Sequence, residues 1–301
     1  MATDCNRKIG HMIYVSIVLI ACAIYTFPVK ATDWKWSVSP LLGVYSPQLG
    51  DLYDKEFRAP LPGTGGIVID NAASQTYDFT IENPLPTIRF ATEAGIELQL
   101  EFNEKNRLLF GIGSWEGVST SVIKTEVPFQ GVLSQVVYER SGRISTTQYF
   151  IGIRHDLIND GKRRLYLRGT LNEIMDVDYK EDLTFAFVSG PADGFKRVVV
   201  MQSQATGILM LQFGLGGEVF LYDWLSLGFD AGYMKGVDRS TLGNASSRDD
   251  FQTGDSLDLS LPANVGPDGR LWYLDSTGTS YKKMYVDFDG WRALFRINFY
   301  F

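Results

Sequence analysis

Apolar and polar residues alternate along most of the chain with a period of two, in segments of about ten residues. Residues 87–102 are a clear example, because Ile96 and Leu98 fall on one face of a strand and Glu97 and Gln99 on the other. Stretches with the 3.6-residue period of a helix are scarce. The pattern therefore predicts an all-β chain whose strands each have one apolar and one polar face.

Eight strands of this kind can be placed, and the connections between them alternate in length. The strands cover residues 34–45, 87–102, 107–115, 145–157, 163–172, 207–220, 225–233 and 291–301. Tight turns are expected at 103–106, 158–162 and 221–224, and long loops at 46–86, 116–144, 173–206 and 234–284. Asp160-Gly161 is a strong hairpin signal, because this dipeptide tolerates the positive φ that a tight turn needs.

The last strand carries a row of large apolar side chains up to the final residue. Phe295, Ile297, Phe299 and Phe301 share one face, and Arg292 and Arg296 lie on the other. With the strand count and the loop asymmetry, this end resembles the small eight-stranded outer-membrane β-barrels of Gram-negative bacteria, of the OmpA, OmpX and OmpW type.

The resemblance implies a membrane-spanning antiparallel up-and-down β-barrel of eight strands with long extracellular loops and short periplasmic turns. It also implies that Phe295, Ile297, Phe299 and Phe301 form the signal that the barrel-assembly machinery recognises. Periplasmic chaperones, outer-membrane lipid and lipopolysaccharide are the further partners that it implies, and the outer membrane is the implied location.

The first 31 residues fit a secretory signal peptide. Arg7 and Lys8 precede an apolar run, and Ala31 follows it as the expected cleavage position, which leaves residues 32–301 as the barrel. Two alternatives stay open: a transmembrane anchor, for which the apolar run is short, and a lipoprotein signal with Cys22 as the lipidated residue.

Cleavage after Ala31 changes the composition in two respects. It removes Cys5 and Cys22, the chain's two cysteines, so we expect neither disulfides nor thiol chemistry. The leader holds three of the 28 basic residues and one of the 35 acidic residues, so the remainder carries 25 against 34, a net charge of −9. This balance disfavours nucleic acid as a partner.

Charged residues on the polar faces are expected to point into the barrel. They are Arg89, Glu93, Glu97, Glu101, Arg154, Asp156, Arg164, Arg168, Glu218, Asp230, Arg292 and Arg296. Two interpretations are open: a polar pore lining, or a network of ion pairs that fills an interior only wide enough for side chains. We favour the network, because long arginine and glutamate side chains can cross so narrow a space.

Catalytic and metal-binding residues are few. His155 is the only histidine after residue 31, and its position among outward residues favours a membrane-interface anchor over a general base. Aspartates are frequent in the last long loop, but their spacing is not that of a calcium loop. We therefore expect no enzyme activity, no cofactor and no metal.

Two long loops contain expected structure. Ser46 to Phe57 fits a short helix with Leu49 and Leu52 on one face, which would cover the barrel mouth as a lid or plug or pack against other loops. Residues 183–189 and 195–202 flank a turn and predict a hairpin that extends two barrel strands. Ten membrane strands would be the competing count.

These features together predict an outer-membrane scaffold whose surface loops bind an unidentified ligand. The alternative is a narrow channel for small solutes, and the third hypothesis is a lipid-acting enzyme centred on His155.

Overall fold

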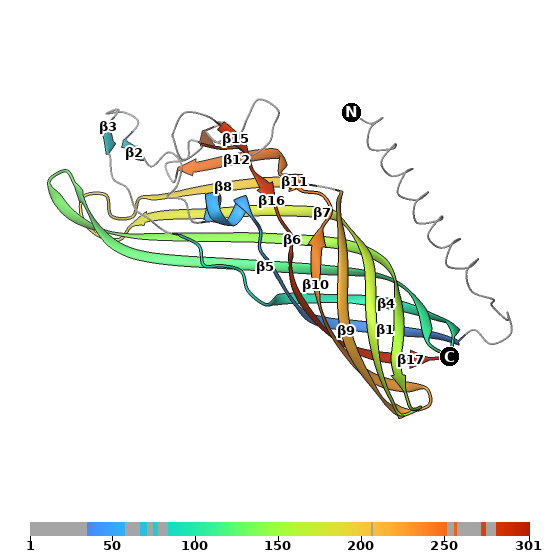
Figure 1. Cartoon of the computed structure of the whole chain (residues 1–301). Helices are drawn as coiled ribbons and strands as arrows, with labels where there is room; N and C mark the ends of the chain where they lie inside the picture. The colour runs from blue at the N-terminus through green and yellow to red at the C-terminus, as the bar shows by residue number, and fades with distance from the viewer. Residues whose placement is uncertain are drawn as a thin grey trace.

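The computed structural model describes residues 35–57, 67–70, 75–77, 84–205, 207–251, 256–257, 272–274 and 281–301, which are almost entirely β-strand (Figure 1). Its eight principal strands are β1 (Lys35–Pro47), β4 (Ala91–Asn103), β5 (Asn106–Phe129), β6 (Val132–Asn159), β7 (Arg163–Phe187), β9 (Ile208–Tyr222), β10 (Leu225–Gly236) and β17 (Gly290–Tyr300). The predicted leader, residues 1–31, lies outside the described residues.

These eight strands form a closed antiparallel ring. Its order is β1, β4, β5, β6, β7, β9, β10 and β17, and β17 pairs back with β1. Each strand counted from the sequence is present, so the prediction of an all-β chain with eight ring strands is confirmed. The described part of the chain also contains shorter strands outside the ring.

The pairing registers set the tilt of the ring strands. A path that follows paired residues once around the ring leaves β1 at Trp36 and returns to it at Ser46, ten residues further on. For eight strands about 4.8 Å apart, this offset corresponds to a tilt of roughly 40° and a ring radius of about 8 Å. Such a ring has room for side chains and little more.

Three ring strands continue past one end of the ring, and further strands beside them complete a curved sheet, which we call the wing (Figure 1). It consists of Glu116–Phe129 of β5, Val132–Ser145 of β6, Val177–Phe187 of β7, then β8 (Lys196–Ala205) and β12 (Gly243–Phe251) with the short β13 (Ser256–Leu257) at its edge. The β5–β6 hairpin runs 14 residues beyond the last β4–β5 pair at Trp115, which is about 45 Å of strand. We call this end of the ring the mouth, and the opposite end, with the three tight turns, the turn end.

The wing corrects the prediction of a long loop at 116–144. β5 and β6 stay paired without a register shift up to Phe129 and Val132, and Gln130 and Gly131 close the hairpin with φ of 47° and 76°. Residues such as Val118, Val122 and Ile123 favour strands, so the strand continues beyond its predicted end at residue 115.

The second expected hairpin is confirmed, and β8 is not a ring strand. β7 runs to Phe187 and β8 returns beside it, pairing Val177 with Ala205, after which β9 takes the same place beside β7 at Ile174. β8 and β9 pair with consecutive parts of the same edge of β7. They therefore lie end to end and occupy one strand position of the sheet. The ten-stranded alternative is therefore excluded.

The helix expected from Ser46 to Phe57 is shorter than predicted. Ser46 and Pro47 belong to β1, and one helical turn, η1 (Leu52–Phe57), follows Leu49 and Gly50, whose φ values are 60° and 51°. These two left-handed residues turn the chain over the mouth. No helix among the described residues is long and apolar enough to cross a membrane.

The remaining strands are short pairs near the mouth and wing. They are β2 (Ile67–Asp70) with β3 (Gln75–Tyr77), β11 (Ser240–Thr241) with β16 (Tyr285–Val286), and β14 (Trp272–Leu274) with β15 (Tyr281–Lys283).

Candidate functional site

The ring interior contains the charged side chains that the sequence assigned to it, with one exception. Eleven of the twelve predicted residues project inward, nine of them buried: Glu93, Glu97, Arg154, Asp156, Arg168, Glu218, Asp230, Arg292 and Arg296 are buried, and Glu101 and Arg164 are half-buried. The period-two pattern of the strands places them on one face, since successive side chains of a strand alternate between faces.

Arg89 is the exception, and its predicted place inside the ring is wrong. Its side chain is exposed, and it precedes β4, which begins at Ala91 rather than Thr87. Phe90, with a φ of 52°, interrupts the extended backbone between them. The alternation of faces that places Glu93 inside the ring therefore does not extend to Arg89.

Arg107 takes the sixth arginine position instead. It is 1% exposed, and it was not among the predicted interior residues because it is the first inward residue after the β4–β5 turn. Arg107 lies on the same face of β5 as Gly111 and Gly113, and this alternation is the signal in the sequence that could have placed it inside the ring. Six arginines thus face six carboxylates inside the ring, and the interior is neutral overall.

Near the turn end, arginines and carboxylates alternate in a chain of contacts. Arg107 lies 2.8 Å from Glu101 and 3.0 Å from Asp156. Asp156 also accepts a hydrogen bond from Arg154 Nε at 2.9 Å, and Arg154 NH2 lies 2.5 Å from Glu218. Such charge-assisted hydrogen bonds compensate ions that have lost their water.

Glu97 is the centre of the next layer. Its two oxygens each lie 2.7 Å from an arginine nitrogen, one from Arg296 and one from Arg168. Asp230 completes the group, 3.0 Å from Arg296 and 3.8 Å from Arg168. Arg168 is held by charge more than by directed hydrogen bonds, since none of its guanidinium nitrogens has a well-aligned acceptor.

Aromatic rings fill the space between these arginines. The Arg154 guanidinium lies 3.7 Å from the centre of the Tyr166 ring and that of Arg296 lies 5.2 Å from it. Phe150 contacts Arg168 in the same way at 5.2 Å. Cation–π contacts of this kind stabilise cations that are shielded from water.

Glu93 and Arg292 form the layer nearest the mouth. Arg292 donates from Nε to Glu93 at 2.7 Å and from NH1 to the side-chain oxygen of Gln212 at 2.8 Å. Gln148 donates to the same Glu93 carboxylate. The charged members of these three layers are almost all 0–2% exposed.

The mouth itself is closed by apolar side chains. Tyr45, Trp115, Met210 and Met234 point inward from four ring strands, and Leu49 packs among them. The full buried cluster is Tyr45, Leu49, Leu52, Leu85, Ile88, Trp115, Ile144, Ile174, Val177, Tyr179, Met201, Ala205, Ile208, Met210, Met234, Leu242, Met284, Val286 and Phe288. Apolar residues at inward positions were visible in the sequence, but their role as a closure was not predicted.

Two chain segments, 48–54 and 284–289, cover this cluster, and we call them the mouth cover. The Leu49 N–H donates to the Asp287 carbonyl at 2.7 Å, and the Gln48 N–H donates to that of Asp289 at 2.8 Å. The cover packs into the ring mouth as a plug, which is one of the two arrangements expected for the first loop.

Asp289 fastens the cover to the end of β10. Its carboxylate accepts the Gly236 N–H at 2.6 Å and pairs with the Lys235 ammonium. Burial raises the pKa of Asp289, but the bonds from Lys235 and Gly236 outweigh burial and hold the pKa below its usual value.

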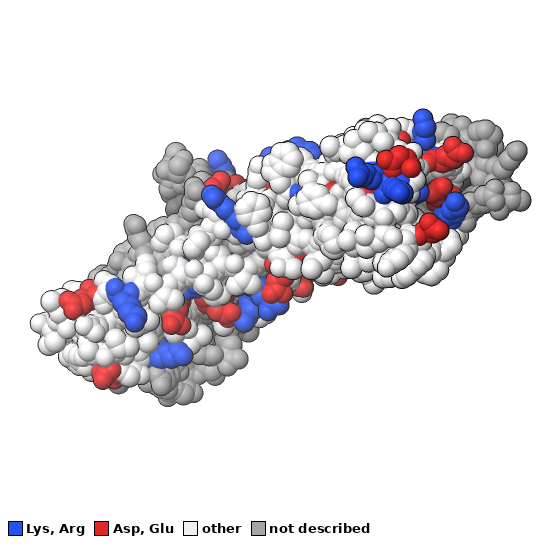
Figure 2. Space-filling model, turned by 90° about the horizontal axis from the view of Figure 1, so that it is seen from below, with Lys and Arg blue, Asp and Glu red and all other residues white. Residues whose placement is uncertain are grey.

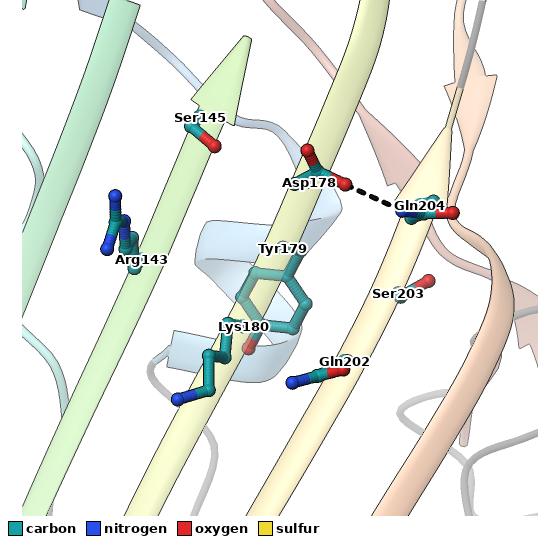
Figure 3. Close-up of a pocket in the computed structure, with 8 residues that line it drawn as sticks. All are labelled: Arg143, Ser145, Asp178, Tyr179, Lys180, Gln202, Ser203 and Gln204. Carbon is teal, nitrogen blue, oxygen red and sulfur yellow. Dashed lines mark hydrogen bonds between the residues drawn. The ribbon is translucent and has the colours of Figure 1, made fainter.

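The outer face of the wing carries a polar hollow of about 420 Å³ next to the ring (Figure 3). Arg143 from β6, Lys180 from β7 and Gln202 from β8 line it, and Asp178 accepts a 2.8 Å hydrogen bond from Gln204. A second hollow shares Ser145 and Asp178 with it. The two offer donors, acceptors and charges of both signs to a polar ligand.

The other predicted residues lie outside the ring. His155 is exposed, and its Nδ1 lies 2.7 Å from the side-chain oxygen of Asn106 on the neighbouring strand. Phe295, Phe299 and Phe301 are exposed on the outer surface, 37–79% accessible, and Ile297 is half-buried on the same face. Among the described residues, no cluster of three or more metal-binding side chains occurs.

Comparison with known proteins gives distant structural likenesses. Neither the protein families nor the curated proteins that were compared match the chain. The outer membrane protease OmpT of Escherichia coli is similar over 91% of this chain and 99% of its own, with 11% identity and a TM-score of 0.39. A major outer membrane protein of Thermus thermophilus is similar over 87% and 98%, with 11% identity and a TM-score of 0.35. A Pseudomonas aeruginosa FadL homologue is similar over 89% of both chains, with 9% identity and a TM-score of 0.21.

Proposed function

We propose that this chain is an outer-membrane β-barrel protein of a Gram-negative bacterium, in which the closed ring is the anchor and the wing is a binding surface outside the membrane. One observation carries the proposal: the charged side chains of the ring are buried and paired inside, while its large apolar side chains are exposed outside. In water this arrangement would be unfavourable, and in a bilayer it is the expected one.

The outer surface of the ring supports a membrane location. Five large apolar side chains on five different strands are 48–67% exposed: Leu42, Ile96, Leu167, Phe213 and Phe229. In Figure 2 a largely uncharged stretch separates the charged groups at one end of the molecule from charged groups nearer its middle. A soluble protein rarely exposes so continuous an apolar band.

Aromatic side chains mark the two borders of this band. Tyr222, Trp224 and Phe299 stack near the turn end, with ring centres 5.7 and 6.4 Å apart, and Tyr233 and Trp291 meet near the mouth at 5.2 Å. Trp291 and Phe299 are eight residues apart on β17, which at a 40° tilt is roughly 20 Å along the ring axis. The outward apolar band of membrane barrels is about 25 Å tall.

The closed interior favours an anchor over a channel. Three layers of ion pairs cross the ring, and the mouth cover lies above them. Binding would then fall to the wing and its polar hollow, which lie beyond the aromatic border at the mouth. In this proposal outer-membrane lipid and lipopolysaccharide surround the ring, and the aromatic row ending at Phe301 is the assembly signal. No catalytic role is assigned to His155.

Single-channel recording in a planar bilayer tests the closed ring. We expect refolded residues 32–301 to insert without conducting, because the interior charges balance and nearly all of them are buried. The double variant Glu97→Gln, Arg168→Gln should also stay silent, since the layers on either side of it remain.

A heat-dependent shift in gel mobility serves as the control that the protein has folded. Steady openings whose ion selectivity changes in the Glu97→Gln, Arg168→Gln variant would contradict the anchor proposal and favour a channel.

A further inference from the structure

One edge of β5 is open where the strand leaves the ring. β5 pairs with β6 along its whole length from Asn106 to Phe129, but it pairs with β4 only as far as Trp115. Beyond Trp115, no strand of the described chain pairs with the other side of β5. An open strand edge is a template for a further strand.

The hydrogen-bonding groups at this edge can be assigned from the ladder. The Asp156 N–H donates to the Lys105 carbonyl at 2.7 Å, so odd-numbered residues of β5 bond to β6 throughout the unshifted ladder. The N–H and C=O groups of the even-numbered residues therefore point to the open edge. These include Val122, Lys124 and Glu126, and also the carbonyl of Pro128.

The part of the edge nearest the ring is less accessible than the tip. Ser119 donates from its hydroxyl to the Pro86 carbonyl at 2.5 Å, and a Cβ at Gly117 would meet Ile88. Residues 84–90 thus pass close to β5 as far as Ser119. The accessible stretch runs from Val122 to Pro128.

This stretch is complementary to itself when it is paired antiparallel. We infer that a second copy of this chain adds its own β5 to the open edge, with Thr125 facing Thr125 across a two-fold axis. Lys124 then lies opposite Glu126 of the other copy, twice in each pair, and opposite charges across strands are stabilising. The side chains of Lys124 and Glu126 are exposed, and no ion pair joins either to another described residue.

Other registers are less favourable. An axis at Lys124 would place lysine against lysine, and like charges directly opposite destabilise a strand pair. A two-fold axis at Thr120 would place the hairpin tip of each copy against the part of β5, up to Trp115, that already pairs with β4. The axis at Thr125 avoids both conflicts.

The pairing would join two wings into one continuous sheet with the rings at its two far ends. On this arrangement the partner of the binding surface is another copy of the protein, which makes the contact homotypic. The role of the contact at a cell surface rests on the proposed function, but the contact itself does not require a membrane.

Cysteine cross-linking tests the register. Residues 32–301 contain no cysteine, so Thr125→Cys introduces a single thiol. In the inferred pair the two Cα atoms are about 4.5 Å apart, within disulfide reach. We expect mild oxidation in detergent to give a disulfide-linked dimer that reducing agent dissociates.

Thr120→Cys is the matched control, because it lies on the same strand but far from the axis. It should stay monomeric under the same conditions. A dimer from Thr120→Cys and not from Thr125→Cys, or monomers from both, would overturn the inference.

Charge exchange in the Thr125→Cys variant distinguishes an effect on strand pairing between copies from an effect on folding. Lys124→Glu should lower the rate of cross-linking roughly fivefold, since it turns two attractive pairs into repulsive ones. Adding Glu126→Lys restores opposite charges and should restore the rate. Equal rates in all three proteins would rule out the inferred register.

Experiments on whole cells distinguish this inference from the proposed function. Labelling of Thr120→Cys by a membrane-impermeant maleimide reports whether the wing is outside the cell. Cross-linking without surface labelling would reject the proposed location and keep the pairing, and surface labelling without cross-linking would do the reverse.

Discussion

At the scale of single residues, Glu97 shows what makes the ring interior stable. It neutralises two arginines at 2.7 Å each, and Asp230 alone would remain to pair with both if Glu97 lost its charge. A buried ion pair adds little over an apolar pair, but leaving one ion without its partner is costly. The interior is therefore sensitive to the loss of any one carboxylate.

We expect Glu97→Gln to lower the free energy of unfolding by about 3–5 kcal/mol, because it leaves buried positive charge uncompensated. Urea titration in detergent or lipid, followed by far-UV circular dichroism, would measure the loss. Glu116→Gln is the control, since the Glu116–Arg143 pair is 46–56% exposed and should contribute at most about 1 kcal/mol. Equal losses for the two variants would contradict the interior role of Glu97.

The arginines show how well the alternation of apolar and polar residues predicts which single side chains point into the ring. Parity placed Arg154, Arg168, Arg292 and Arg296 correctly because each lies within a regular strand. Arg89 lies before a residue of positive φ, and that local backbone turn cannot be read from alternation alone. Errors of parity are confined to strand ends, where the backbone leaves the extended conformation.

At the scale of elements, the mouth cover and the wing are the features that departed most from expectation. The cover is a short irregular segment whose burial depends on residues from many strands, among them Trp115 and Met234. Its sequence predicted a helix, but contacts distant in the chain decided its course. Local propensity is a weak guide where a segment's partners lie elsewhere.

Asp289 makes the mouth cover sensitive to acid. A carboxyl whose pKa is lowered in the folded state adds stability above its unfolded pKa, near 3.9, and this stability is lost as pH falls through the lower folded pKa. We expect the Leu49 amide to stay protected from hydrogen exchange at pH 5–7 and to lose protection below about pH 4. Exchange rates corrected for the intrinsic effect of pH would measure this change.

The same measurement on Asp289→Asn isolates the carboxyl, because the amide keeps an acceptor for the Gly236 N–H but does not titrate. Its protection should vary less with pH between 3 and 7. An unchanged acid response in this variant would show that Asp289 does not cause the effect.

At the scale of the whole molecule, ring and wing are distinct in their surroundings. The ring has charges inside and apolar groups outside, whereas the wing has a polar outer face and a buried apolar cluster that includes Phe129, Phe185 and Phe187. One continuous set of strands therefore carries two opposite arrangements of polar and apolar side chains. The change occurs along β5, β6 and β7, near Trp115, Ser145 and Ile174.

Removal of the wing should leave the ring intact. A variant in which short turns replace residues 119–141 and 180–202 keeps every ring pair and the three interior layers of charge. We expect its urea midpoint to stay close to that of the full chain, while any surface binding or cell-to-cell aggregation is lost. Loss of the folded ring, or unchanged aggregation, would contradict the division of roles.

The sequence by itself determined the eight ring strands, their inward and outward faces and the three tight turns. These depend on period-two alternation and on local turn chemistry such as Asp160-Gly161, which act over a few residues. Only the tertiary structure decided which arginine pairs with which carboxylate, that the mouth is plugged, and that the edge of β5 is open. Those features depend on the register around a closed ring and on contacts between residues far apart in the chain, which no local pattern encodes.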